Sequence, residues 1–290
     1  MTMPGRLFCF GLGYTAARLA TRVAAEGWSV AGTCRDGDSY ERLMREGFDI
    51  SLFNRDTPLD SGILADSTHI LSSIPPDEIG DPVIDLLGQD ICRLDVLEWV
   101  GYLSTTGVYG DAGGDWVDEQ SACNPTALRS RRRLAAERAW QALHQTYGLP
   151  LHVFRLAGIY GPGRSAIDAV RAGRAHRIYK PGHLFSRIHV DDITTILEAS
   201  MRAPQPGAVF NVCDDSPAAQ HDVVAYACEL LGDEPPPMVS FADADLSDMA
   251  RSFYADNRRV RNDHLKSTFG LALRYPTYRE GLKAILETES

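Results

Sequence analysis

The stretch "FCFGLGYTAARLA", residues 8–20, places two glycines between an apolar run and a helical pattern. Gly11 and Gly13 allow a tight turn in which the backbone approaches a ligand, and Ala16 still lets the helix pack closely on the strand. The first amide groups of such a helix have no partner within the helix and attract anions. The stretch therefore predicts a strand, a glycine turn and a helix that hold the pyrophosphate of a dinucleotide. An ordinary tight turn is the alternative for the glycine pattern alone.

The chain repeats this alternation of short apolar runs and helical patterns. Further strands are predicted at 28–35, 48–54, 68–74, 98–105, 149–158 and 207–214. Helices are predicted at 15–27, 39–47, 81–94, 126–147 and 220–232, and near 256–269 and 277–287. Strands that alternate with helices form a parallel sheet with helices on both faces and right-handed crossovers. We therefore predict an α/β fold with a doubly wound parallel sheet.

Composition narrows the class of protein. Hydrophobic residues make up 44% of the 290 positions, which allows a sizeable core, and the net charge of −10 argues against a general nucleic-acid binder. No apolar run approaches the ~18 residues of a membrane span, and the N-terminus lacks a signal-peptide pattern. We therefore expect a cytoplasmic protein with no membrane or nucleic-acid partner. The six cysteines are scattered singly without a Cys-x-x-Cys pair, so we expect neither a metal site nor disulfides.

The end of the second strand bears on which dinucleotide binds. In "GTCRDG", residues 32–37, Cys34 occupies the position where an NAD-binding protein usually carries an acid for the ribose 2′-hydroxyl. Arg35 follows, and its guanidinium can pair with a 2′-phosphate. We therefore favour NADP over NAD as the cofactor. The alternative is a solvated Arg35, with Asp36 serving NAD.

Four further motifs follow the glycine turn in a fixed order. They are "LSTTGVYGD" (103–111), "RLAGIYGPG" (155–163), "RIHVDDI" (187–193) and "FNVCDD" (210–215). Together with the glycine turn, they resemble the extended short-chain dehydrogenase/reductase superfamily, in its NAD-dependent epimerase/dehydratase branch. The resemblance covers roughly residues 5 to 285. Each motif alone is weak, but five in register are specific.

The resemblance implies a two-domain organisation. A Rossmann dinucleotide-binding domain is expected at 1–157 and 187–213, and a smaller, discontinuous substrate domain at 158–186 and 214–290. The active site is expected in the cleft between them, at the carboxyl ends of the strands. The residues expected to bind the cofactor are Gly11, Gly13, Tyr14, Thr15, Ala16, Arg35, Ser73 and Arg133.

The resemblance also implies a catalytic apparatus, and here this chain departs from the family. Thr105 stands where a Ser or Thr orients the reacting oxygen; the alternative is a strand-end threonine that bonds its own backbone. The family carries Tyr-x-x-x-Lys on the next helix, but "ALRSRRRLAAE" (127–137) places Arg129 and Arg133 at these positions. Arg133 can supply the lysine's charge and its bonds to the ribose. Arg129 cannot replace the tyrosine as a proton shuttle because a guanidinium stays protonated.

Other interpretations of the basic residues stay open. Arg129, Arg133 and Glu137 could form a solvated stripe on one helix face, and nucleic-acid binding by the arginine run is disfavoured by the acidic chain. A second basic segment runs from 164 to 189 and contains Arg164, Arg171, Arg174, His176, Arg177, Lys180, His183, Arg187 and His189. It favours an anionic, phosphate-bearing substrate, and a solvated basic surface is its alternative.

Two functions are compatible with these patterns. The first is an NADP-dependent oxidoreductase or epimerase that acts on a small, phosphorylated or nucleotide-linked substrate with Thr105, Arg129 and Arg133 at the reaction site. The second is a non-catalytic protein that binds NADP(H) and reports its level. We favour the enzyme because the substrate segments are present. The resemblance also allows a homodimer through helix 126–147.

Overall fold

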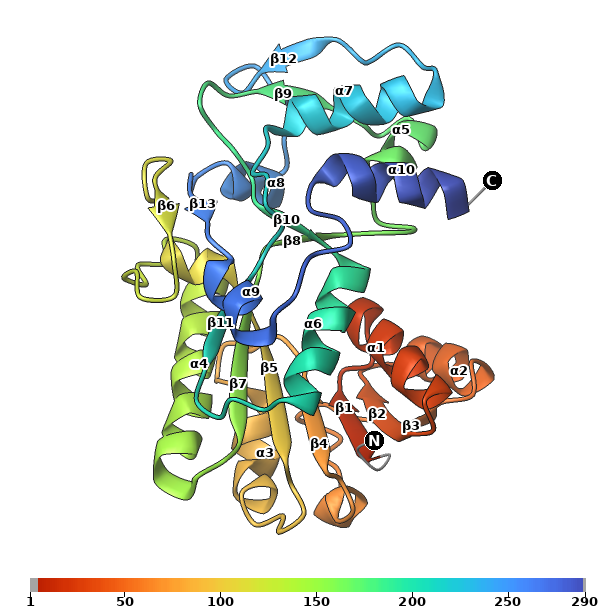
Figure 1. Cartoon of the computed structure of the whole chain (residues 1–290), viewed down its shortest axis with the longest axis vertical. Coiled ribbons are helices and arrows are strands. Elements are labelled where there is room, and N and C mark those ends of the chain that lie inside the picture. Colours follow the sequence, from red (N-terminus) through yellow and green to blue (C-terminus); the bar gives the residue numbers. More distant parts are fainter. Residues whose placement is uncertain (1–4, 289–290) are drawn as a thin grey trace. The chain divides into compact units, whose positions relative to one another are not determined.

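The computed structural model describes residues 5–288 (Figure 1). The chain forms two compact units. The first comprises residues 5–105, 131–155 and 194–210, and the second comprises 106–130, 156–193 and 211–288. The predicted boundaries of the nucleotide-binding and substrate domains run differently, and that division stays a prediction.

A seven-stranded sheet carries the fold, in the order β11-β7-β5-β4-β1-β2-β3. Its strands are β1 (Arg6–Phe10), β2 (Ser29–Cys34), β3 (Asp49–Leu52), β4 (His69–Ser72), β5 (Trp99–Thr105), β7 (Leu151–Leu156) and β11 (Val209–Val212). The pairs β1–β2, β1–β4, β2–β3 and β4–β5 are parallel. The predicted α/β fold of Rossmann type is confirmed, with each of these strands where an apolar run predicted one.

The connecting helices also follow the sequence signals. They are α1 (Tyr14–Ala25), α2 (Gly37–Arg45), α3 (Pro82–Ile91) and α4 (Leu128–Tyr147), together with the 3₁₀ turn η1 (Ser61–Leu64). Asp36 caps α2 by accepting a hydrogen bond from the Ser39 amide. Asp81 caps α3 in the same way, with Pro82 at the first helical position, where its missing N–H costs nothing.

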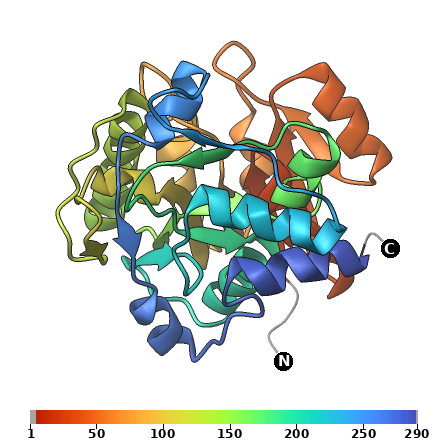
Figure 2. The ribbon, with the colours of Figure 1, turned by 90° about the horizontal axis from the view of Figure 1, so that it is seen from above.

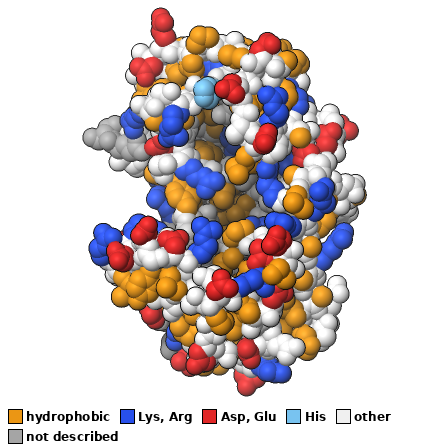
Figure 3. All heavy atoms as spheres, turned by 180° about the vertical axis from the view of Figure 1, so that it is seen from behind, with side chains coloured by type: hydrophobic (Ala, Val, Ile, Leu, Met, Phe, Trp, Pro, Cys, Tyr) orange, Lys and Arg blue, Asp and Glu red, His pale blue; other side chains and the backbone are white. Residues whose placement is uncertain are grey.

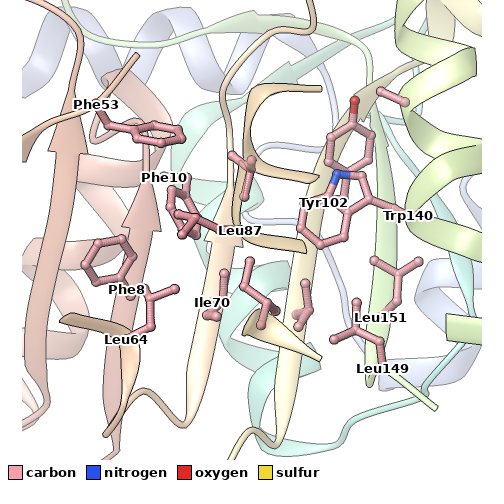
Figure 4. Close-up of a cluster of buried hydrophobic side chains, with 14 of the residues drawn as sticks. Phe8, Phe10, Phe53, Leu64, Ile70, Leu87, Tyr102, Trp140, Leu149 and Leu151 are labelled. Carbon is pink, nitrogen blue, oxygen red and sulfur yellow. The ribbon is translucent and has the colours of Figure 1, made fainter. Parts of the chain in front are cut away.

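One apolar core lies on a face of the sheet within the first unit (Figure 4). Phe8 and Phe10 of β1 pack in it with their ring centroids 5.0 Å apart. Trp140 of α4 is fully buried beside Tyr102 of β5, and its indole N–H donates to the Asp81 carboxylate over 2.9 Å. This bond ties α4 to the cap of α3, so the core fixes both helices against the sheet.

The second unit is built from short strand pairs and helices. Its parallel pairs are β8 (Gly158–Tyr160) with β10 (Arg187–His189), β9 (Arg177–Tyr179) with β12 (Met238–Ser240), and β6 (Trp116–Val117) with β13 (Arg259–Val260). Its helices include α5 (Ala166–Arg171), α7 (Gln220–Leu231), α8 (Asp248–Phe253), α9 (Asp263–Phe269) and α10 (Tyr278–Thr288). Helices α7 and α10 lie side by side around a core that contains Tyr160 and Ile167 (Figures 1 and 2).

The helix predicted near 256–269 is wrong in its first half. Residues before Asp263 pair with the segment around Asp115 instead, where the Arg259 amide donates to the Asp115 carbonyl over 3.0 Å. The backbone groups of 257–260 are thus used by β13 and its neighbours, and the helix begins only at Asp263. The prediction near 277–287 is confirmed by α10.

The surface carries mixed charge. Acidic and basic side chains are interspersed with apolar ones on the face drawn in Figure 3. Between residues 5 and 288, none of the helices combines the length and the apolar character that crossing a membrane requires.

Two buried histidines flank Trp99 in the first unit. His69 of β4 lies 6.1 Å from the Trp99 ring and 4.6 Å from that of Trp28, and His152 of β7 stacks on Trp99 at 5.8 Å. Burial lowers the pKa of both histidines to about 4. The Nε2 atom of His152 accepts the Gln205 amide over 2.6 Å, so the neutral ring matches its surroundings.

We expect the protein to lose stability between pH 7 and pH 5. The unfolded chain protonates these rings near pH 6.5, whereas the folded chain does so near pH 4, so stability falls as the pH drops through this window. Linkage gives a loss of about 2 kcal/mol per histidine between pH 7 and pH 5. Urea unfolding at both pH values measures it. A His69→Gln/His152→Gln variant, although less stable at pH 7, should lose less; an equal loss in both proteins contradicts the assignment.

Candidate functional site

The glycine turn after β1 can only be built with glycine at position 11. Gly11 has a φ of +83°, and a Cβ there would lie 2.9 Å from the Ser73 hydroxyl oxygen and 3.0 Å from Ile74 Cγ1. The Gly11 amide donates to the Thr33 hydroxyl over 2.9 Å, and the Leu12 amide to the Thr33 carbonyl over 2.7 Å. The turn is therefore held between β2 and the end of β4 in one conformation.

The N-terminus of α1 is open. Gly13 is its N-cap residue, with no side-chain cap, and the first turn carries no acidic residue. A Cβ at Gly13 would have no protein atom within 4 Å, whereas Thr15 and Ala16 are buried against the sheet. Tyr14, the first residue of the helix, is half-buried. The first amides of a helix have no partner within the helix, and together with the positive end of the helix dipole they make this a place where an anion can bind.

Ser73 joins the end of β4 to the glycine turn. Its hydroxyl donates to the Gly11 carbonyl over 2.5 Å and approaches the Phe10 carbonyl at 3.3 Å. Two residues that are 62 positions apart in sequence, and that were both predicted to bind the cofactor, thus lie together. Whether they bind it stays a prediction.

Arg133 lies at the carboxyl ends of β4 and β5. Its Nη1 atom donates to the carbonyls of Ile74 and Leu103, over 3.2 and 3.1 Å, and to the Tyr102 hydroxyl over 3.3 Å. Its Nη2 and Nε atoms have no hydrogen-bond partner within residues 5–288. One side of the guanidinium is thus fixed to the sheet, and the other can meet a ligand.

Tyr102 does not replace the tyrosine that the helix lacks. Its ring is fully buried, and burial raises its pKa above the usual range despite the nearby Arg133. A proton carrier at neutral pH needs the opposite shift. The Tyr102 hydroxyl therefore serves as a fixed acceptor for Arg133.

Glu137, one turn beyond Arg133, is not part of a solvated stripe, so that interpretation is wrong. Only 1% of Glu137 is exposed, and its carboxylate accepts from the Ser104 hydroxyl over 2.8 Å and from the Arg155 guanidinium. Arg155 lies in the otherwise buried strand β7. Its presence there indicates an acidic partner, because a buried guanidinium needs an opposite charge. The pair fixes α4 against β5 and β7, next to the predicted site.

Arg129 and Arg133 make separate contacts. The Arg129 guanidinium donates to the Ser252 hydroxyl over 2.7 Å and stacks on the Phe253 ring at 4.2 Å, both at the end of α8 in the second unit. Thr105, the predicted orienting residue, ends β5 in the first unit and is half-buried. The roles of Thr105, Arg129 and Arg133 in catalysis stay predictions.

The end of β2 bears on the choice of dinucleotide. Cys34 is buried, and the Asp36 carboxylate already accepts the Ser39 amide over 2.9 Å as the cap of α2. That hydrogen bond is the main reason why the pKa of Asp36 is lowered. Arg35 between them is exposed.

Several basic side chains of the segment 164–189 are hydrogen-bonded to other residues of the second unit. Arg187 is buried and donates to the carbonyls of Phe185 and Ala218, and Lys180 donates to the Tyr254 carbonyl. The exposed basic side chains of this segment are Arg164, Arg171, Arg174 and His176. The charge that a ligand can reach is therefore smaller than the sequence predicted.

Residues 90–213, which include Thr105, Arg129 and Arg133, match the family model described as NAD dependent epimerase/dehydratase family. This part of the chain therefore resembles the NAD-dependent epimerase/dehydratase family. The predicted resemblance to this family is thereby confirmed.

Similar proteins and solved structures show how far the likeness extends. A functionally unknown conserved protein from Silicibacter pomeroyi DSS has a solved structure that is 51% identical, with a TM-score of 0.91, covering 98% of this chain and 99% of that one. Protein YeeZ of Escherichia coli (strain K12) is 27% identical over 92% of this chain and 94% of its own length. The structure of dTDP-glucose 4,6-dehydratase from Bacillus anthracis in complex with NAD is 17% identical, with a TM-score of 0.76 over 98% and 96% of the two chains. The last shares the Rossmann-type fold of the family.

Proposed function

We propose that the protein is an NADP-dependent oxidoreductase or epimerase that acts on a small, phosphorylated or nucleotide-linked substrate. The open N-terminus of α1 behind the glycine turn is the observation that carries this proposal. The match of residues 90–213 to the epimerase/dehydratase family model supports NAD(P) chemistry, and the NAD-bound dehydratase neighbour supports a nucleotide-sugar class of substrate.

The residues present fit a dinucleotide. Gly13 leaves space for a pyrophosphate at the first amides of α1, and no acidic side chain in the first turn of the helix opposes its charge. Arg133 offers Nη2 and Nε as donors at the carboxyl end of β5, next to the strand that carries Ser73. These donors suit the hydroxyls of a ribose.

NADP is the cofactor that the end of β2 favours. The Asp36 carboxylate accepts the Ser39 amide through Oδ1 and so serves as the cap of α2. The exposed Arg35 guanidinium provides charge-assisted hydrogen bonds for a 2′-phosphate.

In the proposed mechanism, the nicotinamide ring supplies or accepts a hydride when the cofactor is bound. Thr105 holds the reacting oxygen of the substrate, and Arg133 orients the ribose and keeps a positive charge near the reaction centre. The proton on that oxygen would be taken from or released to solvent water, because the Arg129 guanidinium is bonded to Ser252 and cannot lose a proton at ordinary pH. The chain therefore acts chiefly by positioning two reactants.

A non-catalytic NADP(H)-binding protein is the second candidate. The contacts of Arg129 with Ser252 and Phe253 favour it. In the family this position carries the tyrosine that transfers a proton, whereas here it carries an arginine that packs on α8. Turnover distinguishes this candidate from the enzyme.

A Gly13→Ala variant should bind NADPH at least about tenfold more weakly, which is about 1.4 kcal/mol. The Cβ meets no protein atom and Gly13 has a φ of −89°, so the folded protein should keep its melting temperature while the methyl group occupies the space of the pyrophosphate. Titration by NADPH fluorescence measures the affinity, with Gly62→Ala as a control remote from the turn. Unchanged binding in Gly13→Ala would place the dinucleotide elsewhere.

An Arg35→Ala variant should lose NADPH affinity and keep NADH affinity. Removing charge-assisted hydrogen bonds to a phosphate costs roughly 1.5–3 kcal/mol, or about 10- to 100-fold in Kd. Calorimetric titrations with both nucleotides measure the two constants, and Arg45→Ala on the exposed side of α2 is the control. If the wild-type protein prefers NADH and Arg35→Ala does not alter this, NADP is the wrong assignment.

Oxidation of NADPH is expected with a member of a panel of carbonyl compounds and nucleotide sugars. Thr105→Ala should then lower kcat by roughly 10²-fold with little change in NADPH affinity, because a donor to the reacting oxygen acts mainly in the transition state. Full activity in Thr105→Ala would make our site assignment wrong. Tight NADPH binding without turnover on any compound would favour the non-catalytic protein.

A further inference from the structure

An ionic cluster links the segments that follow β3 and β4. The Arg55 guanidinium binds the Asp77 carboxylate through two hydrogen bonds, Nε to Oδ2 over 2.5 Å and Nη2 to Oδ1 over 3.0 Å. Its Nη2 atom also donates to the Asp85 carboxylate of α3 over 2.6 Å. Three side chains from three separate segments of the first unit thus meet at one guanidinium.

Hydrogen bonds within the turn after β4 fix the position of the Asp77 carboxylate. The amides of Ile79 and Gly80 donate to Asp77 Oδ1 over 2.8 and 3.0 Å, and the Asp77 amide donates to the Gly80 carbonyl over 2.9 Å. The preceding Pro75–Pro76 pair restricts the backbone between this turn and Ser73. Asp77 is therefore held by its own turn, independently of Arg55.

The strand order puts this cluster at the same edge of the sheet as the glycine turn. Strands β1 and β2 lie between β4 and β3, so the ends of β3 and β4 are separated by three strand spacings, about 14 Å. Arg55 stands three residues after the end of β3, and Asp77 five residues after the end of β4. Because these four strands are parallel, both segments leave the sheet at its carboxyl edge, which is also the edge where Gly11 and Arg35 follow β1 and β2.

We propose that Arg55, Asp77 and Asp85 form an ionic gate at the edge of the dinucleotide site, and that opening of this gate limits how fast the cofactor binds and leaves. This inference rests on the proposed function, because a gate has a role only where a dinucleotide binds. Arg55 is a positioning residue in this proposal, since it acts through the segments it joins.

The cluster has the properties of a contact that opens readily. The side chain of Arg55 is 23% exposed, and those of Asp77 and Asp85 are each 37% exposed. Ion pairs with such access to water contribute little net stability, so the pair can break without unfolding its neighbourhood. The bond to Arg55 holds the pKa of Asp77 well below its usual range, which keeps the gate charged at neutral pH.

Stopped-flow fluorescence with NADPH tests the gate, using Asp77→Asn and Arg55→Ala in the full chain. The asparagine keeps Oδ1 for the amides of Ile79 and Gly80 and loses the charge that binds Arg55, so the turn should persist. We expect the association and dissociation rates to rise together by roughly three- to tenfold, with Kd changed by less than about twofold. Glu46→Gln removes the comparable surface pair between Arg42 and Glu46 and should change neither rate.

Other results would contradict the proposal that this cluster is a gate. Unchanged rates in both variants, or a weaker Kd with an unchanged association rate, would show that the cluster only stabilises the loops. Hydrogen exchange at the amides of Ile79 and Gly80 shows whether the turn has persisted in Asp77→Asn; Arg55→Ala tests the same contact without altering Asp77. If the wild-type protein binds neither NADPH nor NADH, the proposed dinucleotide site fails, and the gate fails with it.

Discussion

The left-handed backbone of Gly11 is the constraint on which the candidate site depends. Because the residue has no side chain, the end of β4 can approach the turn closely enough for Ser73 to donate to the Gly11 carbonyl. The next residue along, Ile74, offers its carbonyl to Arg133 of α4. A chain of contacts thus runs from the turn after β1 to the helix that carries the family's catalytic pair. A side chain at position 11 would displace Ser73 and Ile74, and with them one of the acceptors that hold Arg133.

Charged residues in the first unit do two different jobs. Glu137 and Arg155 are almost fully buried and form an ion pair, and Glu137 also accepts a hydrogen bond from Ser104. Loss of either charged partner would leave the other charge buried without a counter-charge. The cluster around Arg55 is partly exposed, and water can replace each of its bonds. The same residue types therefore fix one part of the molecule and leave another part free to open.

The fold could be predicted from the sequence because it follows local rules. Apolar runs predicted the strands, and the glycine turn predicted where the first helix begins. The candidate site was predictable only in part. Gly11 and Ser73 were both predicted to bind the cofactor, and they meet because parallel strands β1 and β4 are neighbours in the sheet. The buried strand around Arg155 indicates that this residue needs an opposite charge, but local sequence does not show that Glu137 supplies it, nor that Arg129 contacts Ser252. The β13 strand was missed for the same reason, since its partner lies around Trp116.

The contact between Arg129 and α8 also bears on how this chain could change in evolution. A tyrosine at position 129 would restore a side chain able to carry a proton, but it would remove the hydrogen bond to Ser252 and the cationic stacking on Phe253. The effect of that substitution on the protein therefore depends on which residues α8 has at positions 252 and 253. Gaining a proton carrier at position 129 without losing the packing on α8 would therefore require coordinated changes in α4 and α8 rather than one.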